Sequence, residues 1–244
     1  MADAIPEMRS PAVAAFNDVS TLLPRVFREA WLPLIVVHLL RSVTGELFTY
    51  MASVIQARGR EEIALLASAI ALQFLVEMAW TALWAFVVID AVRRVHGAPS
   101  RSGLDQLRRL NRLLIEGVRA ISAILFRVPL LLIPGLIEFV RLIFVPHVVL
   151  LDHDYDAGRV DALARSRELT RGRWWLLIFS AILLVGFNTY IEILAQGSTD
   201  AWMWERPGGF AITAVITLFS GLAYEVFLVA LFLKLSMMLA LRKD

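Results

Sequence analysis

The side chains with the strongest potential for chemistry are acids and a histidine that follow a long apolar stretch. Asp152, His153, Asp154 and Asp156 stand close together in the chain. Carboxylates and imidazoles at such spacing can bind a hard or borderline cation. The same residues also suit a turn at 156–158 followed by a helix, because Gly favours turns and acids stabilise a helix N-terminus. We favour the second interpretation, a cytoplasmic elbow that anchors a helical hairpin, and expect no metal site.

A second group of candidates consists of charged residues inside otherwise apolar stretches. The members of this expected intramembrane polar network are Arg41, Glu46, Glu77, Arg127, Glu138, Arg141 and Glu225. A charge at the bilayer centre costs about 2.5–3.5 kcal/mol, so these side chains should face the helix bundle and pair. Arg41 and Glu77 fall at the same depth, near mid-span, whereas Arg141 is expected in the outer half. The network could be a path for a proton, ion or anion, or it could be structural or partner pairing, which we favour.

Other catalytic patterns are incomplete. His38 and His147 lack the spacing of a haem or zinc site, and Ser220-Gly221 lacks the frame of a rhomboid protease. The pair Glu61-Glu62 lacks the arginine and histidine motifs of intramembrane diglutamate proteases. The chain contains no cysteine, which excludes thiol catalysis and disulfides. We therefore expect no enzyme, no catalytic residues and no cofactor.

The elements that must position these residues are long apolar helices. The 244 residues are 59% hydrophobic, with a mean hydropathy of +0.69, above the usual range of soluble domains. Segments that can cross a hydrocarbon core of about 30 Å are expected at 31–55, 63–91, 113–133, 135–151, 174–195 and 209–239. The prediction is an all-α, polytopic membrane protein with six transmembrane helices in a single domain, residues 1–244. Pro134-Gly135 should turn the hairpin between the third and fourth spans, and no span contains adjacent Gly and Pro in its middle.

The distribution of cationic residues predicts the orientation. The segments before 31, 92–119, 152–173 and after 233 together hold 18 of the 24 Lys and Arg residues, and the loops on the other side hold 3. Cytoplasmic loops carry the excess of positive charge, so both termini should be cytoplasmic. Nearly all of these cations are arginines, which bind phosphate bidentately.

Amphipathic stretches precede the first, third and fifth spans, and we expect them to lie as helices on the cytoplasmic membrane surface. The first covers 11–28, the second begins near Leu104, and the third surrounds Leu163. The residues expected at lipid headgroups or at the interface are Arg108, Arg109, Arg112, Arg165, Arg167, Arg171, Arg173, Trp174 and Trp175. The expected partners are therefore the bilayer and its anionic phospholipid headgroups, and no nucleic acid.

One stretch carries a family resemblance. Residues 162–172, ALARSRELTRG, resemble the A-L-x-R-S-x-x-L-(T/V)-(K/R)-G segment of six-span bacterial membrane proteins. These are related to the membrane domain found beside glycerophosphoryl diester phosphodiesterases. Residues 144–151 also resemble the family's P-x-V-x-x-x-E run, although Asp152 replaces the usual glutamate. The resemblance implies six spans in a bacterial inner membrane, but not phosphodiesterase chemistry, because no stretch corresponds to that soluble domain.

Two functions remain open. We expect a non-enzymatic accessory or scaffold subunit of a membrane complex, or a membrane-homeostasis factor, with another membrane protein or a second copy as partner. The alternative is a small transporter or channel that uses the buried charges for an ion or an anionic, lipid-derived substrate. A transporter requires a water-reachable cavity lined by the buried charges, whereas a scaffold should show them paired.

Overall fold

The structure, a computed structural model, describes residues 11–57, 63–99, 101–126, 132–196 and 207–241. These residues are mostly helical and contain no strand, so the all-α prediction is confirmed. The helices are α1 (Pro11–Ala57), α2 (Ile63–Val95), α3 (Gly103–Leu125), α4 (Leu132–Arg141), α5 (Val145–Leu151), α6 (His153–Asp156), α7 (Ala162–Thr170), α8 (Trp174–Gln196) and α9 (Pro207–Ala240).

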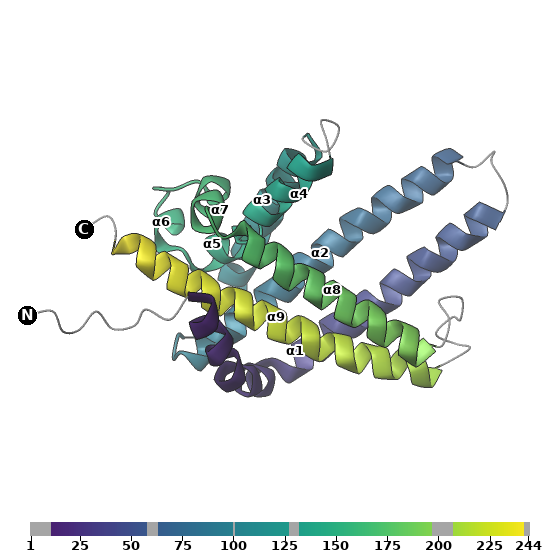
Figure 1. Cartoon of the computed structure of the whole chain (residues 1–244), viewed down its shortest axis with the longest axis horizontal. Helices are drawn as coiled ribbons and strands as arrows, with labels where there is room; N and C mark the ends of the chain where they lie inside the picture. Colours follow the sequence, from purple (N-terminus) through teal and green to yellow (C-terminus); the bar gives the residue numbers. More distant parts are fainter. Residues whose placement is uncertain (1–10, 58–62, 100, 127–131, 197–206, 242–244) are drawn as a thin grey trace, which may run out of the picture.

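The long and short helices form two regions (Figure 1). The long helices α1, α2, α8 and α9 extend away from a cluster of short helices, and the main contacts among them join α1 to α2 and α9, and α8 to α9. The short helices α5, α6 and α7 lie at one end, close to the end of α9. The core is concentrated at this end, where side chains such as Phe144, Leu150, Leu222 and Phe232 are fully buried.

Five stretches are long and apolar enough to cross a membrane. They are Val13–Ile55, Leu75–Val95, Pro134–Leu151, Trp174–Ile191 and Gly208–Ala240. The predicted third span, 113–133, is not among them. Its described part belongs to α3, a continuous amphipathic helix that carries six charged side chains and begins at Gly103. α3 continues through residue 113 without a break, and residues 127–131 lie outside the described part, so the third span stays a prediction.

The kink in α1 coincides with the predicted end of the amphipathic stretch 11–28. Ala30 has non-helical backbone angles (φ −135°, ψ 24°), which divide α1 into two helices. The cause is Pro33, because its ring conflicts with the carbonyl of Glu29 and its nitrogen cannot donate a hydrogen bond. The other long helices also begin and end close to the predicted limits, since α8 covers 174–196 and α9 covers 207–240.

The segment 134–151 is interrupted. A turn at 142–144 separates α4 from α5, and Pro146 lies in the first turn of α5. Pro146 cannot donate to the carbonyl of Leu142 and its ring would clash with that carbonyl, so one helix cannot continue through this point. The predicted turn at Pro134-Gly135 is wrong, because both residues lie inside α4, where a first-turn proline is tolerated.

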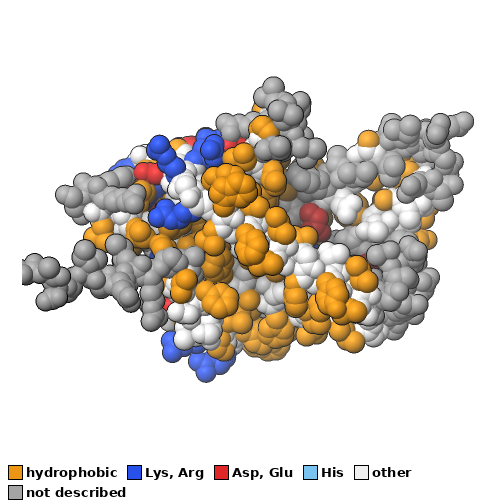
Figure 2. All heavy atoms as spheres, in the orientation of Figure 1, with side chains coloured by type: hydrophobic (Ala, Val, Ile, Leu, Met, Phe, Trp, Pro, Cys, Tyr) orange, Lys and Arg blue, Asp and Glu red, His pale blue; other side chains and the backbone are white. Residues whose placement is uncertain are grey.

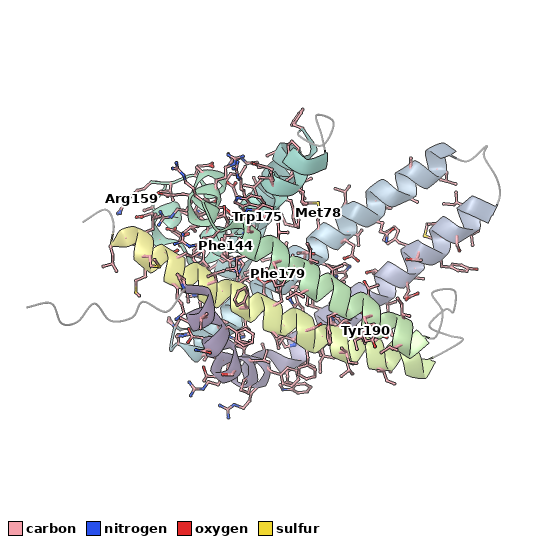
Figure 3. All side chains as sticks on the ribbon, viewed as in Figure 1. Met78, Phe144, Arg159, Trp175, Phe179 and Tyr190 are labelled. Carbon is pink, nitrogen blue, oxygen red and sulfur yellow. The ribbon has the colours of Figure 1, made fainter. Side chains whose placement is uncertain are left out.

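The predicted third surface helix is also wrong. In α7, Ala162, Leu163 and Leu169 are buried, and the helix packs against α5. Exposed apolar side chains lie on the long helices and on α3, where Leu104 is 70% exposed. Figure 2 shows hydrophobic side chains spread over the outer face of the molecule. On α8, Phe179, which is labelled in Figure 3, is 62% exposed.

Candidate functional site

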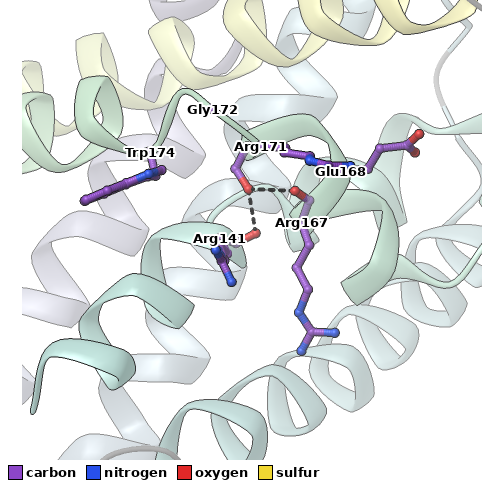
Figure 4. Close-up of a pocket in the computed structure, with 7 residues that line it drawn as sticks. Arg141, Arg167, Glu168, Arg171, Gly172 and Trp174 are labelled. Carbon is purple, nitrogen blue, oxygen red and sulfur yellow. Dashed lines mark hydrogen bonds between the residues drawn. The ribbon is translucent and has the colours of Figure 1, made fainter. Parts of the chain in front are cut away.

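The elbow, which we define as residues 141–175, is built around the break between α4 and α5. The Ser166 hydroxyl from α7 donates to the carbonyl of Arg141 (2.8 Å) and accepts from the amide of Phe144 (3.2 Å). The Thr170 hydroxyl lies between the carbonyls of Arg141 (3.4 Å) and Arg167 (3.2 Å), as Figure 4 shows. Side chains of α7 therefore satisfy the backbone groups that the break leaves without helical partners.

A buried ion pair fixes α7 to the end of α5. The Arg165 guanidinium donates to Asp152 (3.0 Å) and to Glu168 (3.0 Å), and the side chains of Arg165 and Asp152 are both buried. Burial opposes the charged form, but the hydrogen bonds to Glu168 and Asp152 outweigh it and raise the pKa of Arg165. Asp152 also accepts from the amide of Asp154 (2.8 Å) and so caps α6. The prediction that Arg165 contacts lipid headgroups is wrong, because its guanidinium is buried and pairs with Asp152 and Glu168 inside the protein.

Further acids of the elbow bind arginines of α3. Asp161 caps α7 through the amides of Leu163 and Ala164 and pairs with Arg119 (2.8 Å). Burial alone would raise the pKa of Asp161, but the Ala164 amide and the Arg119 guanidinium lower it below its usual range. Asp156 accepts two hydrogen bonds from Arg109, the shorter at 2.9 Å. The polar face of α3 is thus directed at the elbow.

The described ranges contain no arrangement of side chains that supports the metal-site hypothesis. There, no three His, Asp or Glu side chains group closely enough to hold an ion. The three acids of residues 152–156 point to different partners: Asp152 binds Arg165, Asp154 binds Arg159 (3.0 Å) and Asp156 binds Arg109. The predicted turn after Asp156 is present, with Gly158 at φ 69°.

The other predicted headgroup residues have different surroundings. Arg112 lies 3.6 Å from Asp156, Arg108 is exposed, and Arg173 lines a small hollow against α9. Trp174 and Trp175 stack with their rings 3.8 Å apart, and Trp175 is two-thirds exposed. Arg108 and Trp175 are exposed and can reach a membrane surface, whereas Arg112 pairs in part with Asp156 of the elbow.

A pocket of about 400 Å³ opens beside the break between α4 and α5 (Figure 4). Its lining residues are Arg141, Arg167, Glu168, Thr170, Arg171, Gly172 and Trp174. Arg141 was expected in the outer half of the membrane, but it lies in this pocket with Trp174, at the start of α8. The reason is that α4 has only ten residues and ends at Arg141.

The predicted intramembrane network is divided between separate places. Arg41 of α1 pairs with Glu77 of α2 at 2.9 Å, as their equal depth suggested. Glu138 of α4 is fully buried and instead accepts from Arg167 of α7, with 2.8 Å to Nε. Arg167 was expected at headgroups, so this partner was missed. Glu46 lies on α1 beyond Arg41, and Arg127 lies outside the described residues.

Glu225 faces a partner that the sequence did not predict. Its carboxylate lies 3.2 Å from Nε2 of His147, which is almost completely buried in α5. Both ring nitrogens of His147 and one oxygen of Glu225 lack a hydrogen bond of normal geometry in the described structure. His38, in contrast, is hydrogen-bonded to the carbonyl of Ala214 on α9 (2.8 Å) and so joins α1 to α9.

Sequence reasoning missed the capping roles of Ser166 and Thr170. The available signal was a serine and a threonine one helical turn apart, downstream of a proline that must interrupt a span.

Comparison with known proteins adds no assignment. The chain matches no protein-family model, no curated protein and no solved structure among those compared.

Proposed function

We propose that the protein is a non-enzymatic accessory or scaffold subunit of a complex in a bacterial inner membrane, with cytoplasmic termini. A role in membrane homeostasis through such a complex belongs to the same proposal. The family resemblance of residues 162–172 supports the bacterial setting. The positive-inside distribution of arginine supports the orientation.

The observation that carries the proposal is the exposure of the Arg41–Glu77 pair. The two side chains are 41% and 32% exposed, although they lie in apolar helices. The exposed parts of these two side chains would face lipid in an isolated chain. Charges in contact with hydrocarbon are costly, and intramembrane ionisable groups normally face protein or water. A second protein surface, from a partner or another copy, would cover the pair.

The test is purification from native membranes in mild detergent, with mass spectrometry of the copurifying proteins. We expect a stoichiometric partner or a second copy to accompany the wild-type chain. The double variant Arg41→Met/Glu77→Met, which replaces the pair with apolar side chains, should lose that partner while keeping its helical content. Asp18→Asn is the matched control, because it breaks the Lys234–Asp18 pair (2.8 Å) elsewhere in the molecule. A wild-type chain that purifies alone as a monomer contradicts the proposal.

The alternative, a small transporter or channel, is favoured by a different observation. His147 and Glu225 form a protonatable pair in the core whose polar atoms are not fully hydrogen-bonded. Such groups in transporters can carry protons. Purified protein in liposomes should then show a proton or anion flux that Glu225→Gln removes. Equal flux in protein-containing and empty liposomes would exclude this alternative.

A further inference from the structure

We propose that the pocket beside the break between α4 and α5 binds the phosphate group of an anionic ligand, which a phospholipid headgroup presents. This inference concerns a ligand site and goes beyond the scaffold function. It does not depend on the Arg41–Glu77 surface, so the two proposals can fail independently.

The charges that line the pocket are not balanced within the protein. Three arginines and one glutamate line it. Arg167 is engaged by Glu138, and Glu168 is engaged by Arg165. In the described part of the chain, the guanidinium groups of Arg141 and Arg171 form no ion pair. Two arginines without an acidic partner at one pocket form a site for phosphate oxygens, which guanidinium groups bind bidentately.

The backbone around the pocket holds these two arginines in place. Arg141 is the last residue of α4, and its carbonyl accepts from the Ser166 hydroxyl (2.8 Å). Arg171 follows the last residue of α7, and Gly172 then takes a positive φ of 76°, which lets the chain turn into α8. Residues 30 positions apart in the sequence therefore line the same pocket.

The position of the pocket favours a lipid as the source of the phosphate. Trp174 lines the pocket and begins the apolar stretch Trp174–Ile191. A tryptophan at the start of a span lies at headgroup level, where phosphates are present at high density. The volume of about 400 Å³ lies in the range of small-molecule sites and exceeds the need of a bare phosphate ion.

Native mass spectrometry of the full-length protein in detergent tests the site directly. The protein is titrated with phosphatidylglycerol and, separately, with phosphatidylcholine of the same acyl chains. We expect tighter binding of phosphatidylglycerol, and we expect Arg141→Gln/Arg171→Gln to weaken it by about tenfold or more. The control Arg25→Gln/Arg159→Gln removes the same charge from exposed positions that lie outside the pocket and are not among the predicted headgroup residues, and it should change binding less than about twofold. Figure 3 shows Arg159 at the surface, and its side chain is 67% exposed.

Other outcomes of these titrations would overturn the phosphate site or its lipid source. An equal loss in both double variants, or no loss in the pocket variant, overturns the proposal, because general charge attraction would then explain binding. If soluble glycerol phosphate binds the wild type as tightly as the lipid, the lipid source is overturned. Thermal melts show whether the pocket variant is folded. If it is not, the single change Arg171→Gln, at an exposed position after α7, decides the question by the same titration.

Discussion

The elbow and the long helices are stabilised by different interactions. In the elbow, helices of four to ten residues are held by hydroxyl caps and ion pairs, such as Ser166 on the Arg141 carbonyl and Arg165 on Asp152. In the long helices, apolar side chains such as Phe179 are directed outward, and only 6% of the residues of the α8 span are buried. Helices shorter than about 12 residues are not stable alone, so the short elements depend on tertiary contacts, whereas the long ones are apolar enough to cross a membrane.

This difference predicts where substitutions are severe. Polar substitutions should matter most in the elbow, where the charged groups of Arg165 and Asp152 are buried and paired. On the long helices, apolar truncations should matter only on the inner faces. Four experiments follow from the comparison, in order of decreasing effect.

The largest effect is expected from Asp152→Ala. It removes a partner of the buried Arg165 and the cap of α6, which should cost about 3–5 kcal/mol of unfolding free energy. The matched control is Asp154→Ala, because its pair with Arg159 is exposed and worth at most about 1 kcal/mol. Reversible unfolding in mixed detergent micelles measures both. Equal costs would show that burial does not distinguish the two pairs.

Next in size is the contrast between two neighbours on α8. Leu177 is 1% exposed, so Leu177→Ala should cost about 2–5 kcal/mol through the cavity it leaves. Phe179 is directed outward, so Phe179→Ala should change stability by no more than about 0.5 kcal/mol in the same micelles. A larger cost at Phe179 than at Leu177 would contradict the orientation of α8.

The break between α4 and α5 should be sensitive to its cap. Ser166→Ala leaves the buried amide of Phe144 without its acceptor, at a cost of about 1–3 kcal/mol. Hydrogen exchange at that amide should become faster. Ser122→Ala on α3 is the control, because that hydroxyl is exposed and donates only within its own helix. Unchanged exchange at Phe144 would show that Ser166 does not protect the break.

The smallest effect is a dependence on pH. Because the pKa of Asp161 is lowered in the folded protein, its contribution to stability is present above the ordinary carboxyl pKa of about 3.9. That contribution is lost as the pH falls through the folded-state value. Melting temperatures of wild type and Asp161→Asn should therefore differ by a constant amount above about pH 5 and converge as the pH falls from about 5 to about 2. A constant difference over this interval would show that the Arg119–Asp161 pair does not couple protonation to folding.

Local features of the fold could be predicted because they depend on neighbouring residues. The kink of α1 follows from Pro33, and the extents of α8 and α9 follow from continuous apolar sequence. The predictions failed where the position of a short segment depends on contacts with residues that are distant in the sequence. α7 has a surface-helix pattern, yet it is buried because Ser166 and Arg165 have partners on other elements.

In the candidate site, too, local features could be predicted from the sequence, whereas contacts between distant residues could not. Arginine content, the elbow motif and the start of α8 at Trp174 were determined by the sequence alone, because they rest on composition and on helical periodicity. Only the tertiary structure decided that Arg141 and Arg171 line one pocket, that Glu138 pairs with Arg167, and that Glu225 faces His147. Periodicity fixes which side of a helix a residue occupies, but the break after Arg141 and the packing of α7 decide which distant side chains meet.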